Sequence, residues 1–131
     1  MTTIEHLSPA GVPAPRGPYS AAVRAGDYIF VSGQVPVDPA TNELSTGDIQ
    51  EQTRMVLNNV SLVLDGAGAT MADVVRVGVY LGDGNDFAAM NEVYAEFFGH
   101  TKPARSTIVC SFIAAIKVEI DCIVYKPAIA A

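Results

Sequence analysis

The sequence predicts an α+β domain of two layers, in which one mixed β-sheet carries two helices on one of its faces. Three observations lead to this prediction. Strand-like and helical segments follow one another in the order ββαβαββ over residues 1–131. Only two segments have the apolar spacing of a helix, which is too few to cover both faces of the sheet. Many residues on the second face of the strands are also apolar or small, so we expect an oligomer packed through that face.

The first third of the chain combines a stiff loop with a hairpin. Four prolines and two glycines fall within residues 9–18, which predicts an extended loop. A strand over residues 21–24 and a second over 28–35 follow, and residues 3–7 are predicted to add one more. Gly33 lies inside the second of these strands, where it indicates a bulge or the close approach of another group.

The first helix is predicted to begin after Asp48, a capping residue that has Glu51 three positions later, as in a capping box. The residues of its buried face then recur with helical spacing, at Ile49, Thr53, Val56, Leu57, Val60, Val63 and Leu64. Gly66 and Gly68 are expected to end this helix.

A strand and a second helix follow. The strand is predicted over residues 74–81, with one face formed by Val75, Val77, Val79 and Leu81. The second helix is predicted to start at Asn85 or Asp86 and to end at Gly99. Its apolar stripe is predicted to contain Phe87, Met90, Tyr94 and Phe97. Two final strands complete the predicted sheet.

The composition is that of a folded chain: half of the 131 residues are hydrophobic and 17% are charged. The formal net charge is −6, and the eight basic residues are scattered along the chain without forming a stripe. This balance disfavours binding to phosphate backbones, so no nucleic-acid partner is expected.

The sequence also bears on location and metal binding. Residues 1–7 lack the basic start and apolar stretch of a signal peptide, and no run of about 18 apolar residues predicts a membrane span. Cys110 and Cys122 lie in apolar, strand-like runs, so we expect a cytoplasmic protein with two reduced core thiols and no membrane contact. His6 and His100 are isolated, and no metal site is predicted.

Arg105 is the most unusual residue of the chain, because a guanidinium normally seeks water or a carboxylate. It opens a strongly apolar strand, and Glu119 lies fourteen residues further on, in the last strand. Side chains alternate along a strand, and the even positions of both strands have the character of the helix-covered face. Arg105 and Glu119 are therefore expected to share the face away from the helices, at a subunit interface if oligomerisation buries that face.

Two interpretations of Arg105 remain open on these grounds. In the first, Arg105 pairs with a nearby acid and merely holds the interface together. In the second, it binds a ligand carboxylate through two parallel hydrogen bonds. Glu119, in an enclosed site, would then have a basicity suited to proton transfer.

Six motifs in chain order carry a resemblance over essentially the whole sequence: Gly17-Pro18-Tyr19-Ser20, Ser32-Gly33-Gln34-Val35-Pro36, Asn58-Asn59, Asn85-Asp86-Phe87 with Asn91, Pro103-Ala104-Arg105-Ser106, and Val118-Glu119-Ile120. Each motif alone is weak, but all of them in this order are specific. With them, the sequence resembles the Rid family, the YjgF-type reactive-intermediate or enamine/imine deaminases.

The resemblance implies a chorismate-mutase-like fold and a homotrimer with barrel-like packed sheets and three clefts between its subunits. It implies the activity of a 2-iminobutanoate/2-iminopropanoate deaminase. Such an enzyme hydrolyses 2-imino acids, formed from enamines such as 2-aminoacrylate, to 2-keto acids and ammonia. The implied ligand is thus a small 2-imino or 2-keto acid, and no metal or organic cofactor is implied.

The resemblance also implies roles for individual residues. Three would be catalytic: Arg105 clamps the substrate carboxylate, Glu119 positions and activates water, and Tyr19 lies near the imine. Ser32 and Gly33 would line the cleft. Asn91 would lie at the pocket rim, and a backbone N–H at Thr107, where many members have Cys, would meet the carboxylate.

Departures from the family pattern keep alternatives open. Residues 110–116 lack the Leu-Pro loop of common members, which motivates a non-catalytic carboxylate-binding or protein-interaction trimer that uses the same cleft. A 2-aminomuconate-type deaminase is a further alternative, while the acidic charge argues against a ribonuclease or translation inhibitor. Single residues keep alternatives too. Tyr19 also fits a core or interface position, and Asn91 fits a simple helix-side hydrogen bond. Asp121 fits either a second pocket acid or a solvated or paired strand acid.

Overall fold

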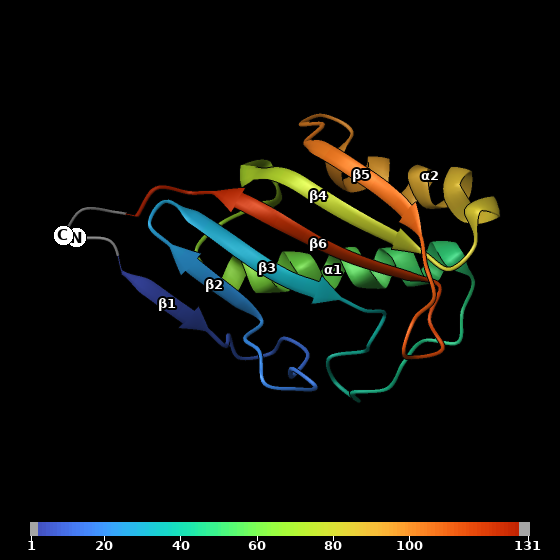
Figure 1. The fold of residues 1–131 in the computed structure, drawn as a ribbon, viewed down its shortest axis with the longest axis horizontal. Coiled ribbons are helices and arrows are strands. Elements are labelled where there is room, and N and C mark those ends of the chain that lie inside the picture. The colour runs from blue at the N-terminus through green and yellow to red at the C-terminus, as the bar shows by residue number, and fades with distance from the viewer. Residues whose placement is uncertain (1–2, 129–131) are drawn as a thin grey trace.

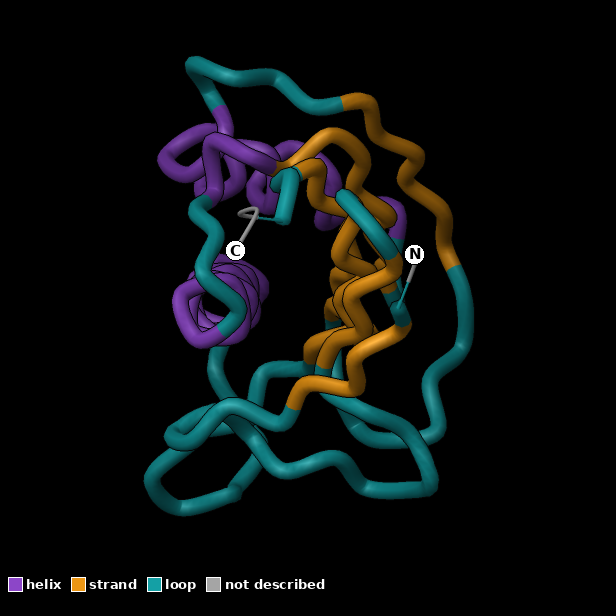
Figure 2. Tube along the Cα trace, turned by 90° about the vertical axis from the view of Figure 1, so that its left-hand side faces the viewer, coloured by secondary structure: helices purple, strands orange, loops and turns teal. Residues whose placement is uncertain are grey.

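The computed structural model of the chain describes residues 3–128. It consists of a six-stranded sheet with two helices packed on one face, as the sequence predicts. Figure 1 shows the sheet in front of the helices, and Figure 2, turned by 90°, shows the two layers side by side.

The sheet has the strand order β1-β2-β3-β6-β4-β5. Its strands are β1 (Ile4–Leu7), β2 (Ala22–Ala25), β3 (Tyr28–Gln34), β4 (Val74–Leu81), β5 (Ala104–Val109) and β6 (Val118–Tyr125). All neighbouring strands are antiparallel except β4 and β5, which run parallel and are joined through the second helix. The mixed sheet and the extra N-terminal strand are therefore confirmed, and β5 forms one edge of the sheet.

Helix α1 (Ile49–Gly66) follows the predicted pattern closely. The Asp48 side chain accepts a hydrogen bond of 2.9 Å from the Glu51 backbone N–H, which satisfies one of the free donors of the first turn. All the residues predicted for the buried face are buried. Gly68, just after the helix, has a φ of +80°, a conformation that favours glycine.

Helix α2 (Phe87–Phe98) buries a slightly different stripe from the predicted one. Met90, Val93, Tyr94 and Phe98 are its buried residues, whereas Phe87 is 46% exposed. Phe98 therefore takes the core position predicted for Phe97, which is only partly buried. Phe87 lies in the first turn and faces Arg105 instead of the core.

One prediction about β4 is wrong. Val75 is 43% exposed, and Val74 is buried in its place. The pairing of β4 with β6 shifts register between Val74 and Arg76, so Val75 is an extra residue in the ladder. Such a bulge breaks the strict alternation of side chains, which is the reason the prediction fails at this position.

The core fills the space between the sheet and the two helices. Val56, Leu57 and Val60 of α1 pack there with Val77 of β4 and Ile120 of β6, all of them fully buried. This burial of apolar surface is the main force that holds the layers together. Within residues 3–128, no helix combines the length and the apolar character needed to cross a bilayer.

The two cysteines differ from the prediction of two core thiols. Both are free, and Cys122 is buried under the helices, but Cys110 follows β5 and is only half-buried. Burial raises the pKa of the Cys122 thiol to about 12, so this side chain stays protonated at neutral pH.

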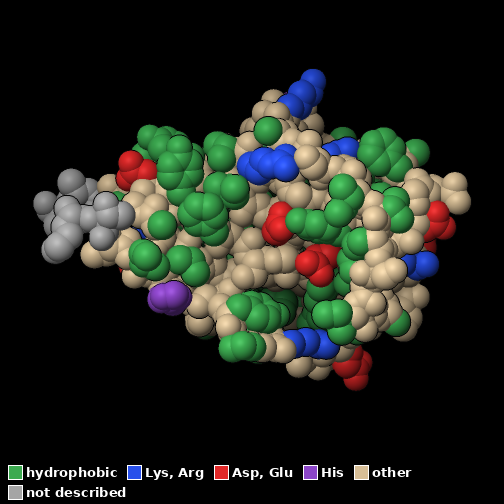
Figure 3. All heavy atoms as spheres, viewed as in Figure 1, with side chains coloured by type: hydrophobic (Ala, Val, Ile, Leu, Met, Phe, Trp, Pro, Cys, Tyr) green, Lys and Arg blue, Asp and Glu red, His purple; other side chains and the backbone are tan. Residues whose placement is uncertain are grey.

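Within the described residues, the other face of the sheet carries no helix and is largely apolar. Tyr28, Phe30 and Tyr125 are each 45% exposed on it, and the rings of Tyr28 and Tyr125 meet edge to face at 5.3 Å. Figure 3 shows hydrophobic side chains spread over this bare face, with acidic side chains near its middle. An apolar sheet face of this kind is typical of a surface that another protein surface covers.

Candidate functional site

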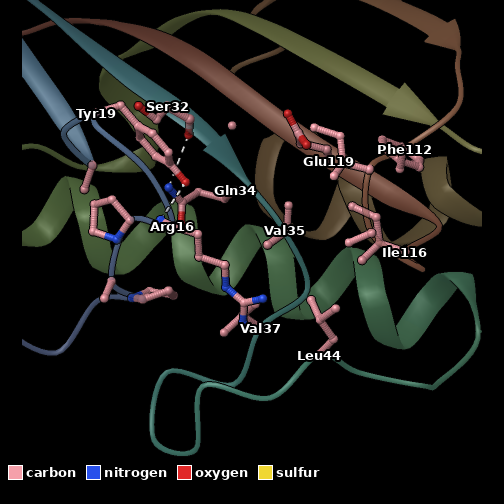
Figure 4. A pocket seen from close by; sticks show the side chains of 17 residues that line it. Arg16, Tyr19, Ser32, Gln34, Val35, Val37, Leu44, Phe112, Ile116 and Glu119 are labelled. Atoms are coloured by element: carbon pink, nitrogen blue, oxygen red, sulfur yellow. Dashed lines mark hydrogen bonds between the residues drawn. The ribbon is translucent and has the colours of Figure 1, made fainter.

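A cavity of about 560 Å³ opens where β3 ends beside β6. Four segments line it: the proline-rich loop, the end of β3 with the residues after it, the loop that precedes β6, and the start of β6 at Glu119. Figure 4 shows Glu119 at one side of this pocket and Tyr19 and Arg16 at the other. Most of its wall is apolar, which is usual for a site that binds a small molecule.

Gly33 and Glu119 fit together in this pocket. The register between β3 and β6 shifts between Val31 and Gln34, so Gly33 lies in a bulge. A Cβ atom added at Gly33 would collide with the Glu119 carboxylate and lie 2.9 Å from its Cδ atom. Both sequence predictions for Gly33, a bulge and a close approach, are therefore confirmed. The absent side chain makes the space that the carboxylate occupies.

Glu119 is half-buried and lines the cavity. Its carboxylate forms no ion pair within residues 3–128. Burial, and to a lesser degree the nearby charge of Asp121, raises the pKa of Glu119 above its usual value. A raised pKa makes a carboxylate a stronger general base than an exposed glutamate.

Asp121 lies two residues further along β6, on the same face, but does not line the cavity. Its carboxylate accepts a hydrogen bond of 3.0 Å from the Tyr80 hydroxyl, and a Cβ atom at Gly78 would collide with it. This hydrogen bond is the main reason why the pKa of Tyr80 is raised. Of the two interpretations of Asp121, the paired strand acid is confirmed.

Tyr19 and Ser32 also line the pocket. The Tyr19 hydroxyl oxygen accepts a 3.1 Å hydrogen bond from the Arg16 backbone N–H, which leaves its own proton free to donate. The Ser32 hydroxyl donates to the Ser20 carbonyl at 2.6 Å. Ser32 is thus held by the backbone, and within residues 3–128 its hydroxyl makes no hydrogen bond to a histidine that could activate it as a nucleophile.

Arg105 lies on the opposite face of the sheet from Glu119, so the prediction that the two share a face is wrong. β5 pairs with β4 so that Arg105 stands beside Val77, which is buried under the helices. The even position Ile108 is 51% exposed on the bare face. The prediction fails because β5 is an edge strand, where the residue types on the two faces differ too little to reveal which one is covered.

Aromatic rings of α2 hold the Arg105 guanidinium. Its Cζ atom lies 4.6 Å from the ring centroid of Tyr94 and 5.7 Å from that of Phe87, both within the range of a cation–π interaction. No acid pairs with Arg105 within residues 3–128. Within these residues, no acid partner supports the interpretation in which Arg105 merely pairs with a nearby acid. These contacts are to aromatic rings and not to an anion, so the positive charge of Arg105 stays available to a carboxylate.

Two buried hydroxyl groups near Arg105 have no hydrogen-bond partner within the described residues: Tyr94 Oη and Thr107 Oγ1. Burial raises the pKa of Tyr94, although the charge of Arg105 acts in the opposite direction. Asn91 is half-buried on α2, one turn from Phe87 and Tyr94, and so lies on the same side of the helix.

The predicted site residues thus form two groups in one chain. The Glu119 half-site contains Tyr19, Ser32, Gly33 and Glu119 around the cavity. The Arg105 half-site contains Arg105 and Thr107 on β5 and Asn91 on α2. None of the latter three lines the cavity. One chain therefore does not present Arg105 and Glu119 to the same small ligand.

The segment where the sequence departs from the family pattern forms part of the pocket wall. Phe112, Ile113, Ala114 and Ile116 all line the cavity, and the side chain of Ile113 is fully exposed. Sequence analysis missed Arg16, which also lines it. A single cation in a proline-rich loop gives no sequence signal of a binding role. Within residues 3–128, no group of three or more His, Cys, Asp and Glu is placed to hold a metal ion.

Comparison with known proteins identifies relatives of this chain. The sequence model of the endoribonuclease L-PSP family matches residues 10–126. A RutC family protein of Pyrococcus horikoshii is 51% identical over 115 residues, which cover 87% of this chain and 91% of that protein. The 2-iminobutanoate/2-iminopropanoate deaminase of Dermatophagoides farinae is 42% identical over 113 residues, 86% of this chain and 88% of the other.

The fold is shared with solved structures. The E. coli protein TdcF, solved with bound serine, superposes with a TM-score of 0.88 at 36% identity, covering 93% of this chain and 98% of TdcF. The fold, the match to the family model and the similar proteins all indicate the same family. The chain belongs to the endoribonuclease L-PSP family, also called the YjgF/Rid family.

Proposed function

We propose that the protein hydrolyses small 2-imino acids to 2-keto acids and ammonia, with Glu119 as the group that activates water. The observation that carries this proposal is the position of the Glu119 carboxylate over Gly33, in a mostly apolar cavity and without an ion-pair partner in the described chain. The name of the Dermatophagoides farinae relative supports the choice of substrate.

The reaction requires little more than positioning and proton transfer. A protonated C=N bond is already electrophilic, so water adds to its carbon while the Glu119 carboxylate takes a proton from that water. The π electrons of the C=N bond move to nitrogen and give a carbinolamine. The proton then passes from Glu119 to this nitrogen, the carboxylate takes up the hydroxyl proton, and the C–N bond breaks. The products are the 2-keto acid and ammonia, and Glu119 ends with the proton released by the iminium substrate.

We propose further that the working site lies between two copies of the chain, in a homotrimer. Arg105, the Thr107 backbone N–H and Asn91 of one copy would bind and position the substrate carboxylate. Tyr19, Ser32, Gly33 and Glu119 of the next copy would surround the imine. The separation of the two half-sites, the unpaired Arg105 and the apolar bare face support this arrangement. Homo-oligomers can form closed rings in which one surface of each copy contacts a different surface of the next copy.

The activity is tested with 2-iminopropanoate, generated in the assay by an amino-acid oxidase in the presence of catalase. Semicarbazide traps the imine that remains. The wild-type protein is expected to accelerate the loss of imine over buffer, and Arg105→Ala and Glu119→Gln are each expected to abolish that acceleration. Arg54→Met and Glu92→Gln are matched controls on the helix surfaces, where Arg54 pairs with Glu96 and Glu92 with Gln50.

Absence of any acceleration by the wild-type protein contradicts the proposed reaction for this substrate. If 2-keto acids still raise the melting temperature, and do so only with Arg105 present, the result favours the non-catalytic carboxylate-binding protein. The altered pocket wall at residues 112–116 is the structural feature consistent with that second function.

A further inference from the structure

Arg16 lines the same cavity as Glu119, but the proposed hydrolysis of a small imino acid gives it no task. In Figure 4 its side chain extends past Val37 towards the part of the pocket that Leu44 borders, away from Glu119. Arg16 and Glu119 are the cation and the anion among the residues that line this cavity. The pocket therefore has opposite charges at two separate places.

The Arg16 side chain is exposed, and a hydrogen bond from outside its own loop orients it. Its Nη2 atom donates a hydrogen bond of 2.9 Å to the Asn42 carbonyl, 26 residues away. Asn42 has a φ of +61° in a tight turn. The turn is closed by the Asn42 N–H, which donates to the Asp38 carbonyl at 2.7 Å, and by the Asp38 N–H, which donates to the Glu43 carbonyl at 2.9 Å. A neutral carbonyl thus orients the guanidinium but leaves its charge uncompensated. Four of its five N–H donors make no hydrogen bond within residues 3–128.

No acid neutralises Arg16 within the described chain, because both ion pairs there involve other residues. The wall between Arg16 and Glu119 is mostly apolar: Val35, Val37 and Leu44 belong to it, and Gln34 is its polar member. A cation at the end of an apolar wall is suited to a ligand with methylene groups and an anionic end. Such a site is poorly suited to a ligand whose far end is only hydrocarbon, because the guanidinium would then lose bound water without gaining a hydrogen-bond acceptor.

We propose that Arg16 binds a second acidic group of the substrate, so that the pocket accepts 2-imino dicarboxylic acids. This inference rests on the proposed function. The imine carbon lies by Glu119, the methylene groups of the side chain lie along the apolar wall, and the distal carboxylate meets the free donors of Arg16. The C=N bond is hydrolysed by the same step, and both carboxylates are unchanged. At about 560 Å³ the cavity has room for a four- or five-carbon chain.

The test compares three imines, formed in the assay from alanine, leucine and glutamate by the matching oxidases. The imines from leucine and glutamate are similar in size but differ in the end of the side chain. The wild-type protein is expected to hydrolyse 2-iminoglutarate with a kcat/KM about tenfold or more above that for the leucine-derived imine. In Arg16→Met this ratio should fall by about tenfold, since one charged hydrogen-bond pair is lost. Arg54→Met should keep the wild-type ratio.

Several results would overturn the inference. One is an unchanged ratio in an Arg16→Met protein that melts like the wild type, and another is a wild-type preference for the leucine-derived imine. If none of the three imines is hydrolysed, the proposed function fails. The role of Arg16 is then tested by ligand binding: the rise in melting temperature with 2-oxoglutarate is compared with the rise with 4-methyl-2-oxopentanoate. A larger rise with 2-oxoglutarate that disappears in Arg16→Met supports the dicarboxylate site, and an equal rise with both ligands refutes it.

Discussion

Arg105 and Glu119 lie on opposite faces of the same sheet, Arg105 against the rings of Tyr94 and Phe87 and Glu119 against the backbone of Gly33. Each residue is held by its neighbours without an ion pair in the described chain. A side chain poised in this way keeps its capacity to interact with a ligand. Because the two residues lie on opposite faces of the sheet, the proposed reaction requires contact between two copies of the chain.

The space above Gly33 is predicted to be essential for activity. In Gly33→Ala the new methyl group displaces the Glu119 carboxylate, so kcat/KM for the imine should fall by at least about tenfold, the scale of loss expected from a misplaced catalytic group. The melting temperature should change little, because Gly33 does not have a positive φ. Steady-state kinetics and thermal unfolding measure the two effects.

Gly84→Ala is the matched control for this change. A Cβ atom at Gly84 would lie 3.5 Å from Val109, which is an ordinary contact. It should keep wild-type kinetics. Full activity in Gly33→Ala would show that the observed position of Glu119 is not the working one.

The ring of Tyr94 is predicted to position Arg105. Tyr94→Leu removes the closer of the two cation–π contacts, so KM should rise by about three- to tenfold while kcat changes less. Tyr94→Phe keeps the ring and removes a hydroxyl that has no partner in the described chain, so it should retain near-wild-type KM. Equal losses in both variants would contradict the role of the ring.

The pH dependence of the reaction should report on Glu119. The proposed reaction requires its carboxylate form, and its pKa is raised mainly by burial and additionally by Asp121. The acid limb of kcat/KM should therefore lie above the pH at which an ordinary glutamate titrates. Asp121→Asn removes the neighbouring charge and should move this limb to lower pH without abolishing it. Tyr80→Phe removes the hydrogen bond but leaves the charge of Asp121, so it should not produce that downward shift.

The raised pKa also predicts a cost in stability. The folded chain binds the Glu119 proton more tightly than the unfolded chain, so its contribution to the free energy of unfolding falls as pH rises through the interval between the two pKa values. Glu119→Gln should therefore unfold at a higher temperature than the wild type at pH 8, and the difference should shrink towards pH 4. A variant that is less stable than the wild type at pH 8 would contradict this explanation.

The sequence predicts the fold well where two signals agree. For α1, the cap at Asp48 and the apolar stripe define the same helix, and the structure confirms both. For β6, the alternation of apolar and polar residues correctly separates Glu119 from the buried Ile120. A strand that is covered on one face alternates apolar and polar residues, so its two faces can be recognised in the sequence.

Other features depend on strand pairing and on contacts between distant segments, which cannot be recognised in a single sequence. The bulge at Val75 is fixed by the register between β4 and β6, and the orientation of Arg105 by the parallel pairing of β5 with β4. Arg16 enters the pocket because its loop folds back against the turn that contains Asn42. These contacts join segments far apart in the chain, and no local pattern reports them.

The most direct test of the account mixes two inactive variants. Arg105→Ala lacks one half-site and Glu119→Gln lacks the other, and the two proteins are unfolded and refolded together in equal amounts. If each working site combines Arg105 of one copy with Glu119 of the next, random assembly restores about a quarter of the wild-type activity. If the mixture stays as inactive as either variant alone, while wild-type protein treated in the same way recovers, the site is not shared between copies and the central claim is wrong.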